Sequence, residues 1–247
     1  MSSKNNDLSR VDMHVHSKYS HDCSTSLEDI GEAMKRKHVG VALTDHNEVQ
    51  GSLNLKKLYP KALIIPAIEV TSVNSKDLLL YFDKHSELSA FYERHIKPNK
   101  KLTRRINKTT LSTNYILDIA SDYNAFRVLP HPFMRIKGSF RKIKKDPSTL
   151  KFVDGIEVLN ASKSKKDNQK SVEWCKELNM PFTAGSDSHI LSTLGNARII
   201  SKANTPSLIM DEIKKKQVEV EGESDGFLGN VRGIGAIVRN KLTKRRI

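Results

Sequence analysis

Short apolar runs alternate with amphipathic stretches along most of the chain. The apolar runs lie at residues 11–16, 39–43, 62–71, 75–82, 126–131, 154–160, 181–187 and 197–200, and they have the length of buried strands. Apolar positions at helical spacing predict helices between them, at 26–34, 87–96, 112–123, 165–178 and 207–216. This alternation predicts an α/β fold in which most strands are parallel.

One domain accounts for the length, because α/β barrels commonly occupy a chain of 247 residues. We expect a flexible N-terminus at residues 1–10, a barrel at 11–220 and a basic C-terminal tail at 221–247. There is no run of about 18 apolar residues, and no charged start precedes an apolar stretch, so we expect no transmembrane span or secretion signal. Two cysteines, Cys23 and Cys175, are too few for a disulfide framework, which favours a reducing cytoplasmic setting.

Positive charge is concentrated in three segments. The formal net charge is +14, and residues 97–108, 135–145 and 232–246 each hold six Lys or Arg and no acidic residue. Such segments are either solvated surface or contacts for the phosphates of a nucleic acid. They hold few aromatic residues that could stack on bases, so single-strand binding is not indicated. The second segment contains Gly138 and precedes Pro147, and we expect it to be a loop.

Ionisable side chains gather at the ends of the predicted strands. His14 and His16 are two residues apart on the first strand, so both rings leave the same face. Because the ends of parallel strands share one rim of a barrel, we expect residues from several strands to meet there. Imidazoles and carboxylates together suit Mn, Fe or Zn better than Mg. The candidate metal ligands are His14, His16, Asp22, His46, Glu69, His131, Asp187 and His189.

Four short motifs resemble those of the PHP (polymerase and histidinol phosphatase) family of metal-dependent phosphoesterases. They are DMHVH at 12–16, TDHN at 44–47, HPF at 131–133 and DSH at 187–189, in the order of the family. Glu69, within IPAIEV, resembles the bridging glutamate of the family. The resemblance covers approximately residues 11–200 and implies a distorted (β/α)7 TIM-like barrel with a two- or three-metal centre.

The resemblance also implies a role for each candidate ligand. The implied groups are His14, His16, Glu69 and Asp187 for one ion, Glu69 and His131 for a second, and Asp22, His46 and His189 for a third. Several divalent ions in one pocket lower the pKa of a bound water and clamp phosphoryl oxygens, so a metal-bound hydroxide would be the nucleophile. We expect catalysis to depend on Glu69, His131 and Asp187 in particular.

Further residues near the motifs are candidates for the site. Many relatives have a histidine on the strand after the bridging glutamate, where this chain has Asp77, which either replaces it as a ligand or leaves the second ion weaker. We expect Asp45 to hold an imidazole rather than an ion. Glu157 and Asn160 end a strand at the rim and are candidates for substrate contact or for support of the ligands. Arg135, just after the HPF motif, is a candidate phosphate contact.

Two functional hypotheses from different classes follow. The first is a phosphoesterase whose substrate is a phosphorylated small molecule or a nucleic acid, cleaved as a phosphomonoester or a phosphodiester, with nucleic-acid contacts through the basic loops. The second is a non-catalytic RNA-binding barrel that resembles the ribonuclease P protein subunit. A barrel of the second kind does not need the eight ligand-type residues, so their presence favours the enzyme.

Overall fold

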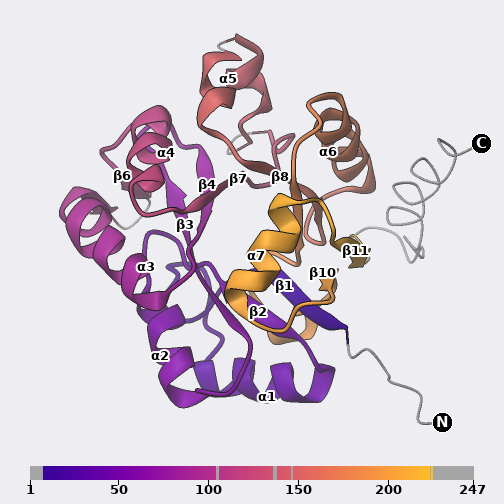
Figure 1. Ribbon diagram of the computed structural model, residues 1–247. Helices are drawn as coiled ribbons and strands as arrows, with labels where there is room; N and C mark the ends of the chain where they lie inside the picture. The colour runs from indigo at the N-terminus through magenta and orange to yellow at the C-terminus, as the bar shows by residue number, and fades with distance from the viewer. Residues whose placement is uncertain (1–7, 104–105, 136–137, 146, 223, 225–247) are drawn as a thin grey trace, which may run out of the picture.

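The computed structural model describes residues 8–103, 106–135, 138–145, 147–222 and 224 (Figure 1). Nine of the described strands form one sheet, and β5 and β6 form a separate hairpin. The order in the large sheet is β11-β10-β1-β2-β3-β4-β7-β8-β9. The strands are β1 (Ser9–Val15), β2 (Gly40–Leu43), β3 (Ile64–Thr71), β4 (Asp77–Tyr81), β5 (Lys100–Thr103), β6 (Ile106–Thr109), β7 (Phe126–Leu129), β8 (Gly155–Asn160), β9 (Phe182–Gly185), β10 (Ala197–Ser201) and β11 (Glu219–Gly222).

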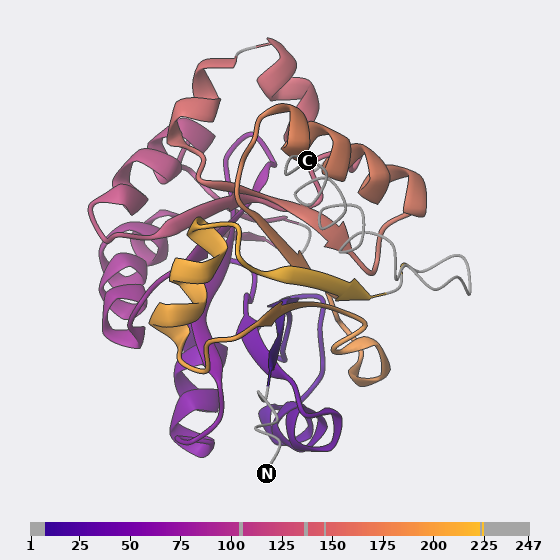
Figure 2. The ribbon, with the colours of Figure 1, turned by 45° about the vertical axis from the view of Figure 1, so that its right-hand side comes forward.

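Hydrogen bonds at the end of β9 return the sheet to β1 and nearly close a barrel. The Asp187 N–H donates to the His14 carbonyl at 2.7 Å, and the His16 N–H donates to the Ser188 carbonyl at 3.0 Å. Gly185 permits this approach, because a Cβ there would overlap the backbone and Cβ of His14. The barrel strands are β1, β2, β3, β4, β7, β8 and β9, which confirms the predicted distorted (β/α)7 barrel. Strands β10 and β11 extend the sheet beside β1 (Figure 2).

The distortion comes from β4, which runs antiparallel to both of its neighbours. β1, β2 and β3 are parallel to one another, as are β7, β8 and β9, whereas β4 pairs antiparallel with β3 and β7. The first residue of β4, Asp77, pairs with Thr71 at the end of β3. A residue at the start of β4 therefore reaches the rim where the other barrel strands end.

Helices surround the barrel, as Figure 1 shows. Ser26, Ser112 and Ser164 accept hydrogen bonds from backbone N–H groups in the first turns of α1, α4 and α6, which satisfies donors that a helix start leaves unpaired. The helices are α1 (Leu27–Lys37), α2 (Gln50–Leu58), α3 (His85–Phe91), α4 (Thr113–Ser121), α5 (Phe140–Lys145), α6 (Lys165–Glu177) and α7 (Pro206–Lys214). None of the helices in the described ranges is long and apolar enough to span a membrane.

Helix α7 packs at the end of the barrel away from the candidate site. Its buried side chains Ile209, Met210 and Ile213 belong to the main hydrophobic core. Lys216, just after this helix, donates to the carbonyl of Asn179, which precedes β9. Helix α7 thus covers the end of the barrel where strands start, and the candidate site lies at the opposite end, where the parallel strands finish.

The basic segments and one helix differ from expectation. Residues 97–108 contain the β5–β6 hairpin, and residues 135–145, expected to be a loop, contain α5. Helix α2 had no sequence signal, because Val49 at its start provides no side-chain cap and Gly51 lies in its first turn. β1 begins at Ser9, two residues before the expected start of the barrel. The predicted tail lies outside the described residues, apart from 221, 222 and 224.

Candidate metal centre

His14, in β1, and His16, just after it, stand at the centre of the rim and are buried. The protein fixes the outer nitrogen of each ring, because His14 Nδ1 is 2.9 Å from Glu157 Oε1 and His16 Nδ1 is 3.0 Å from Ser20 Oγ. Ser20 Oγ donates its own proton to Asp45 at 3.1 Å, so it accepts from His16. Both rings are thereby oriented with Nε2 toward the interior of the site, as metal-ligating histidines are.

Glu69, near the end of β3, lies between four imidazoles. Its Oε2 is 3.2 Å from His14 Nε2, 3.3 Å from His16 Nε2 and 3.1 Å from His46 Nδ1. Its Oε1 is 3.4 Å from His131 Nε2, on the other side of the carboxylate. A carboxylate whose two oxygens face different ligand sets can bridge two ions, which is the role that the resemblance implies.

Asp187, which follows β9, faces the same space as Glu69. Its Oδ1 is 3.3 Å from His16 Nε2 and 3.6 Å from His14 Nε2. Its Oδ2 points the other way and accepts hydrogen bonds from Asn160, the last residue of β8, and from Ser162 in the loop that follows. One oxygen of Asp187 is therefore directed at the imidazoles, and the protein holds the other.

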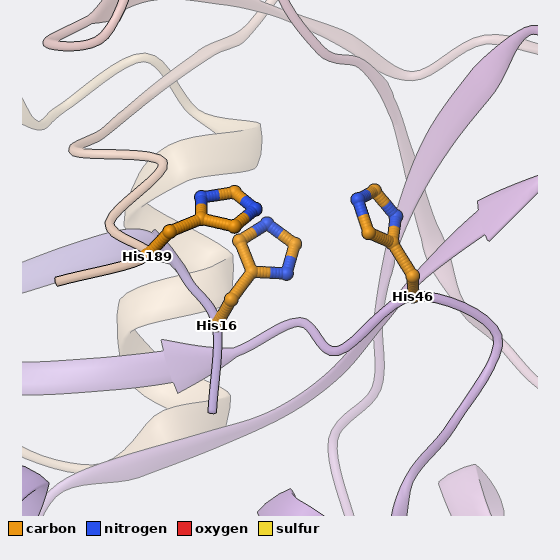
Figure 3. A group of neighbouring side chains, drawn as sticks. All are labelled: His16, His46 and His189. Atoms are coloured by element: carbon orange, nitrogen blue, oxygen red, sulfur yellow. The ribbon is translucent and has the colours of Figure 1, made fainter. Parts of the chain in front are cut away.

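A second set of ligand atoms surrounds Asp22, in the loop between β1 and α1. Asp22 Oδ2 is 3.5 Å from His46 Nε2 and 3.4 Å from His189 Nε2. The rings of His16, His46 and His189 come from three separate segments and face a common space (Figure 3). The His16 ring centroid is 4.2 Å from that of His189 and 4.7 Å from that of His46. The structure thus brings all eight predicted ligands together at one rim.

The donor set fits divalent ions. Among the described residues, no hydrogen-bond partner reaches the buried atoms His16 Nε2, Glu69 Oε1 and His131 Nδ1. Buried polar atoms without partners are costly, and convergent ones indicate a ligand that satisfies them. The triads whose ligand atoms lie within 4.8 Å of one another are His14, His16 and Glu69; His14, His131 and Asp187; His16, His46 and His189; and His46, Glu69 and Asp77.

Nearby charges in the cluster outweigh the effect of burial on the pKa values of its two carboxyl groups. Burial favours a neutral carboxyl group, yet His46 and His14 hold the pKa of Glu69 well below its usual range. Burial likewise opposes ionisation of Asp187, and His14 and His16 again hold its pKa well below the usual range. Burial lowers the pKa of His16 to about 3, which keeps this imidazole neutral. Despite burial, Asp187, Glu157 and Glu69 raise the pKa of His14 well above its usual value, so this imidazole favours a proton that a bound ion would displace.

The backbone at the rim is strained at two predicted ligands. His131 has φ 28° and Asp187 has φ 54°, in the left-handed region that residues with a Cβ seldom adopt. Each such residue costs about 1–3 kcal/mol, so it persists where the surrounding structure requires it. Asp187 is held in this conformation by the bond from its N–H to the β1 backbone.

Asp77, the departure from the family pattern, lies within the cluster. It is buried, and the Thr71 hydroxyl donates to its Oδ1 at 2.7 Å. Its carboxylate forms one of the candidate ligand triads with His46 and Glu69. The antiparallel direction of β4 explains how a residue at a strand start reaches this position.

The other predicted site residues divide into two groups. Asp45 accepts hydrogen bonds from Ser17 and Ser20, and Glu157 accepts from the His131 N–H and from Asn160, so these residues support the ligands. Gly51 is required beneath Asp45, because a Cβ there would overlap its carboxylate. Arg135 is exposed, and the described residues show no ion pair between it and a predicted ligand.

Sequence reasoning missed two contacts that depend on loop conformation. Lys163, in the loop after β8, places its Nζ 2.8 Å from Asp187 Oδ2. Asn107, in β6, donates to the His46 carbonyl at 3.1 Å and to His21 Nδ1 at 3.2 Å. In the sequence, Lys163 is marked only by its position just after a strand that ends in polar residues. No sequence pattern indicates a role for Asn107.

The β5–β6 hairpin thereby lies beside the site. Asn107 also accepts a hydrogen bond from Asn47 Nδ2 at 3.1 Å. Lys100, at the start of the hairpin, is largely buried and forms an ion pair with Glu48 at 2.9 Å. Lys100 is thus an anchor of the hairpin rather than a free surface cation, whereas Lys101 is exposed.

The barrel and the converging ligands at its strand ends define a metal-dependent hydrolase of the phosphoesterase class at the level of the family. The sequence matches the model of the PHP domain over residues 12–111 and a model described as PHP-associated over residues 165–218. The chain belongs to the PHP family.

Individual relatives are more distant. The uncharacterized protein MJ0417 of Methanocaldococcus jannaschii is 28% identical over 195 residues, which cover 77% of this chain and 69% of that protein. The lesion-specific endonuclease PfuEndoQ of Pyrococcus furiosus has a similar fold, with a TM-score of 0.69 at 18% identity over 87% of this chain and 59% of that chain.

A two-domain protein of Bacteroides vulgatus, described as containing a predicted PHP-like metal-dependent phosphoesterase, also has a similar fold. The TM-score is 0.63 at 14% identity, and the match covers 89% of this chain and 66% of that chain. This chain therefore spans only part of both solved proteins, and these likenesses establish the fold.

Proposed function

We propose that this protein hydrolyses a phosphomonoester or a nucleic-acid phosphodiester with two or three divalent ions held at the rim of the barrel. The observation that carries the proposal is the convergence of the predicted ligands, with carboxylate oxygens and imidazole nitrogens facing one another at 3.1–3.7 Å. Mn, Zn or Fe suit this mixed nitrogen and oxygen donor set. Bound ions would supply Lewis acidity and activate water for attack on phosphorus.

The residues of the chain have distinct tasks in this proposal. Glu69 bridges two ligand groups, and Asp187 and His131 each contribute to one or more of them. Glu157 and Ser20 fix the rings of His14 and His16, so that the ligand nitrogens do not need to reorganise. A ligand set held in place in this way positions ions and substrate before reaction.

The alternative, a barrel that only binds RNA, does not account for this cluster. Burying ionisable groups and holding two residues at positive φ both cost folding free energy. A surface that binds RNA through its phosphates needs exposed Lys and Arg instead. A role for the cluster itself explains why the chain retains it.

A nucleic-acid substrate is supported by the place of the hairpin. Residues 97–108 carry six Lys or Arg, and this segment contacts the site through Asn107. Among proteins of similar fold, Endonuclease Q has been solved with a 27-mer duplex substrate with an abasic lesion at the active site. Lys101, which is exposed, is a described cation of the hairpin that can reach a polyanion.

The proposed function is tested with Mn-loaded protein, p-nitrophenyl phosphate and a 5′-phosphorylated oligonucleotide. We expect turnover of at least one substrate that requires the added ion. A protein that retains its fold and its bound ions yet turns over neither substrate would contradict the phosphoesterase assignment.

The substrate class is tested by Lys101→Gln combined with Arg104→Gln and Arg105→Gln. Positions 104 and 105 lie outside the described residues, and Lys100 is left unchanged because it anchors the hairpin. We expect weaker action on the oligonucleotide and unchanged action on p-nitrophenyl phosphate. Equal loss on both substrates would remove the support for a nucleic acid.

A further inference from the structure

Lys163 occupies a position that the ligand set alone does not explain. Its ammonium group is 2.8 Å from Asp187 Oδ2 and 2.8 Å from Ser162 Oγ. The side chain is 19% exposed, so the charge is largely desolvated but open to the rim. Lys163 also lies just before α6, whose N-terminal end adds positive potential.

Two neutral donors already hold the outer oxygen of Asp187. Asn160 Nδ2 donates to Asp187 Oδ2 at 3.3 Å, and Ser162 Oγ donates to it at 2.9 Å. These bonds orient the carboxylate and leave its Oδ1 facing the imidazoles. Orientation of Asp187 therefore does not require Lys163.

A cation at this position is unfavourable for metal binding. An ammonium group in contact with a ligand carboxylate partly neutralises the negative charge that would attract the metal ion. The ammonium group also repels that ion. The residue is useful if a second anion enters the site beside the ions. Lysine is suited to this task, because its long stem lets a compact charge move between partners, and it is a common phosphate ligand.

We propose that Lys163 binds a non-bridging oxygen of the phosphoryl group of the substrate, moving to it from Asp187 Oδ2. This inference rests on the proposed function and adds a specificity-determining residue to it. Asn160 and Ser162 then hold Asp187 alone, so the metal site stays intact while Lys163 contacts the substrate. The ligand class is a phosphate or phosphate-ester anion.

The test compares Lys163→Met, which keeps the length of the stem, with Lys163→Arg, which keeps the charge. Lys166→Met is the matched control, because Lys166 is an exposed residue in the first turn of α6. Each Mn-loaded protein is measured for Mn content, for binding of inorganic phosphate by calorimetry, and for KM and kcat with p-nitrophenyl phosphate.

We expect Lys163→Met to weaken phosphate binding and raise KM by roughly ten- to a hundredfold, since a hydrogen bond to a charged group is lost. Mn content should be unchanged, Lys163→Arg should recover part of the affinity, and Lys166→Met should match wild type. Unchanged phosphate affinity in Lys163→Met, or loss of Mn in place of phosphate, would overturn the role of Lys163 and leave the phosphoesterase standing. A wild-type protein that holds Mn but neither binds phosphate nor hydrolyses the ester would overturn the proposed function, and this inference with it.

Discussion

Two clusters of charged side chains in this molecule are built in opposite ways. Arg127, in β7, and Asp154, just before β8, lie at the end where these strands start. Arg127 Nε is 2.7 Å from Asp154 Oδ2 and Nη2 is 2.9 Å from Oδ1, while Nη1 donates to the Leu117 carbonyl at 3.1 Å. At the rim, by contrast, oxygens of Glu69 and Asp187 face ring nitrogens of several histidines.

The comparison distinguishes charged residues that stabilise the fold from charged residues placed to bind a ligand. The Arg127–Asp154 pair matches a planar donor to a planar acceptor, and this geometry requires no third partner. At the rim, among the described residues, the buried atoms Glu69 Oε1 and His131 Nδ1 have no hydrogen-bond partner. Cations satisfy such a cluster, so the two regions should respond oppositely to mutation and to metal.

The largest expected effect is loss of catalysis without loss of fold. Asp187→Asn and His131→Ala remove predicted ligands and should lower kcat/KM by at least about a thousandfold, equivalent to about 4 kcal/mol of transition-state stabilisation. The melting temperature of the metal-free protein should change little, because Asn keeps the shape of Asp187, and the buried His131 Nδ1 has no hydrogen-bond partner to lose among the described residues. Full activity in either variant, measured with p-nitrophenyl phosphate, would refute the assigned site.

Removal of metal should have the next largest effect, and this effect should come from ions bound at the rim. Ions that bind the folded chain alone stabilise it by about 2.7 kcal/mol when their concentration is 100 times the dissociation constant. We therefore expect chelation to abolish turnover and lower the melting temperature, and Mn to restore both. The Asp187→Asn variant serves as the control, since its melting temperature should respond less to Mn. An identical response of the variant and wild type would place the stabilising ion elsewhere.

The opposite end should show the reverse pattern. Asp154→Ala leaves the largely buried Arg127 without its carboxylate and should lower the free energy of unfolding by about 2 kcal/mol. Turnover per folded molecule should stay the same, because the pair lies away from the rim. Denaturant unfolding and active-site titration measure the two quantities, and a fall in kcat at full occupancy of the folded state would show that the two ends are coupled.

The smallest effect is expected where the hairpin supports the rim. Asn107→Ala removes the donor to the His46 carbonyl and the acceptor for Asn47, and should lower kcat/KM by about tenfold. Lys101→Ala, on the same hairpin but exposed, is the matched control and should leave hydrolysis of p-nitrophenyl phosphate unchanged. An equal loss in both variants would point to a general disturbance of the hairpin.

Most of the ligands could be predicted from the sequence because they sit in short motifs at the ends of apolar runs, whereas Asp22 lies in a polar loop after the first strand and was assigned to an ion only through the resemblance. Strand ends converge by topology alone, so the meeting of His16, His46 and His189 required no knowledge of loops. Asp77 was harder to assign to the site. It lies at the start of a strand, and it reaches the rim only because β4 is antiparallel to its neighbours. The fold class was predictable for the same reason, as alternation of strands and helices leaves few topologies.

Loop conformation set the limit of what could be predicted. Lys163 and Asn107 reach the site through segments whose path no periodicity encodes. Lys100 looked like one cation among six in its segment, but its buried partner Glu48 lies about fifty residues away in sequence. Long-range ion pairs of this kind depend on tertiary packing, which local sequence patterns do not encode.

The central claim is that the rim holds divalent ions. Elemental analysis of the purified wild-type protein, with Asp187→Asn measured beside it, tests this claim most directly. We expect two or more ions of Mn, Zn or Fe per wild-type chain and fewer in the variant. A wild-type protein that binds no divalent ion, even after exposure to Mn, would contradict the account.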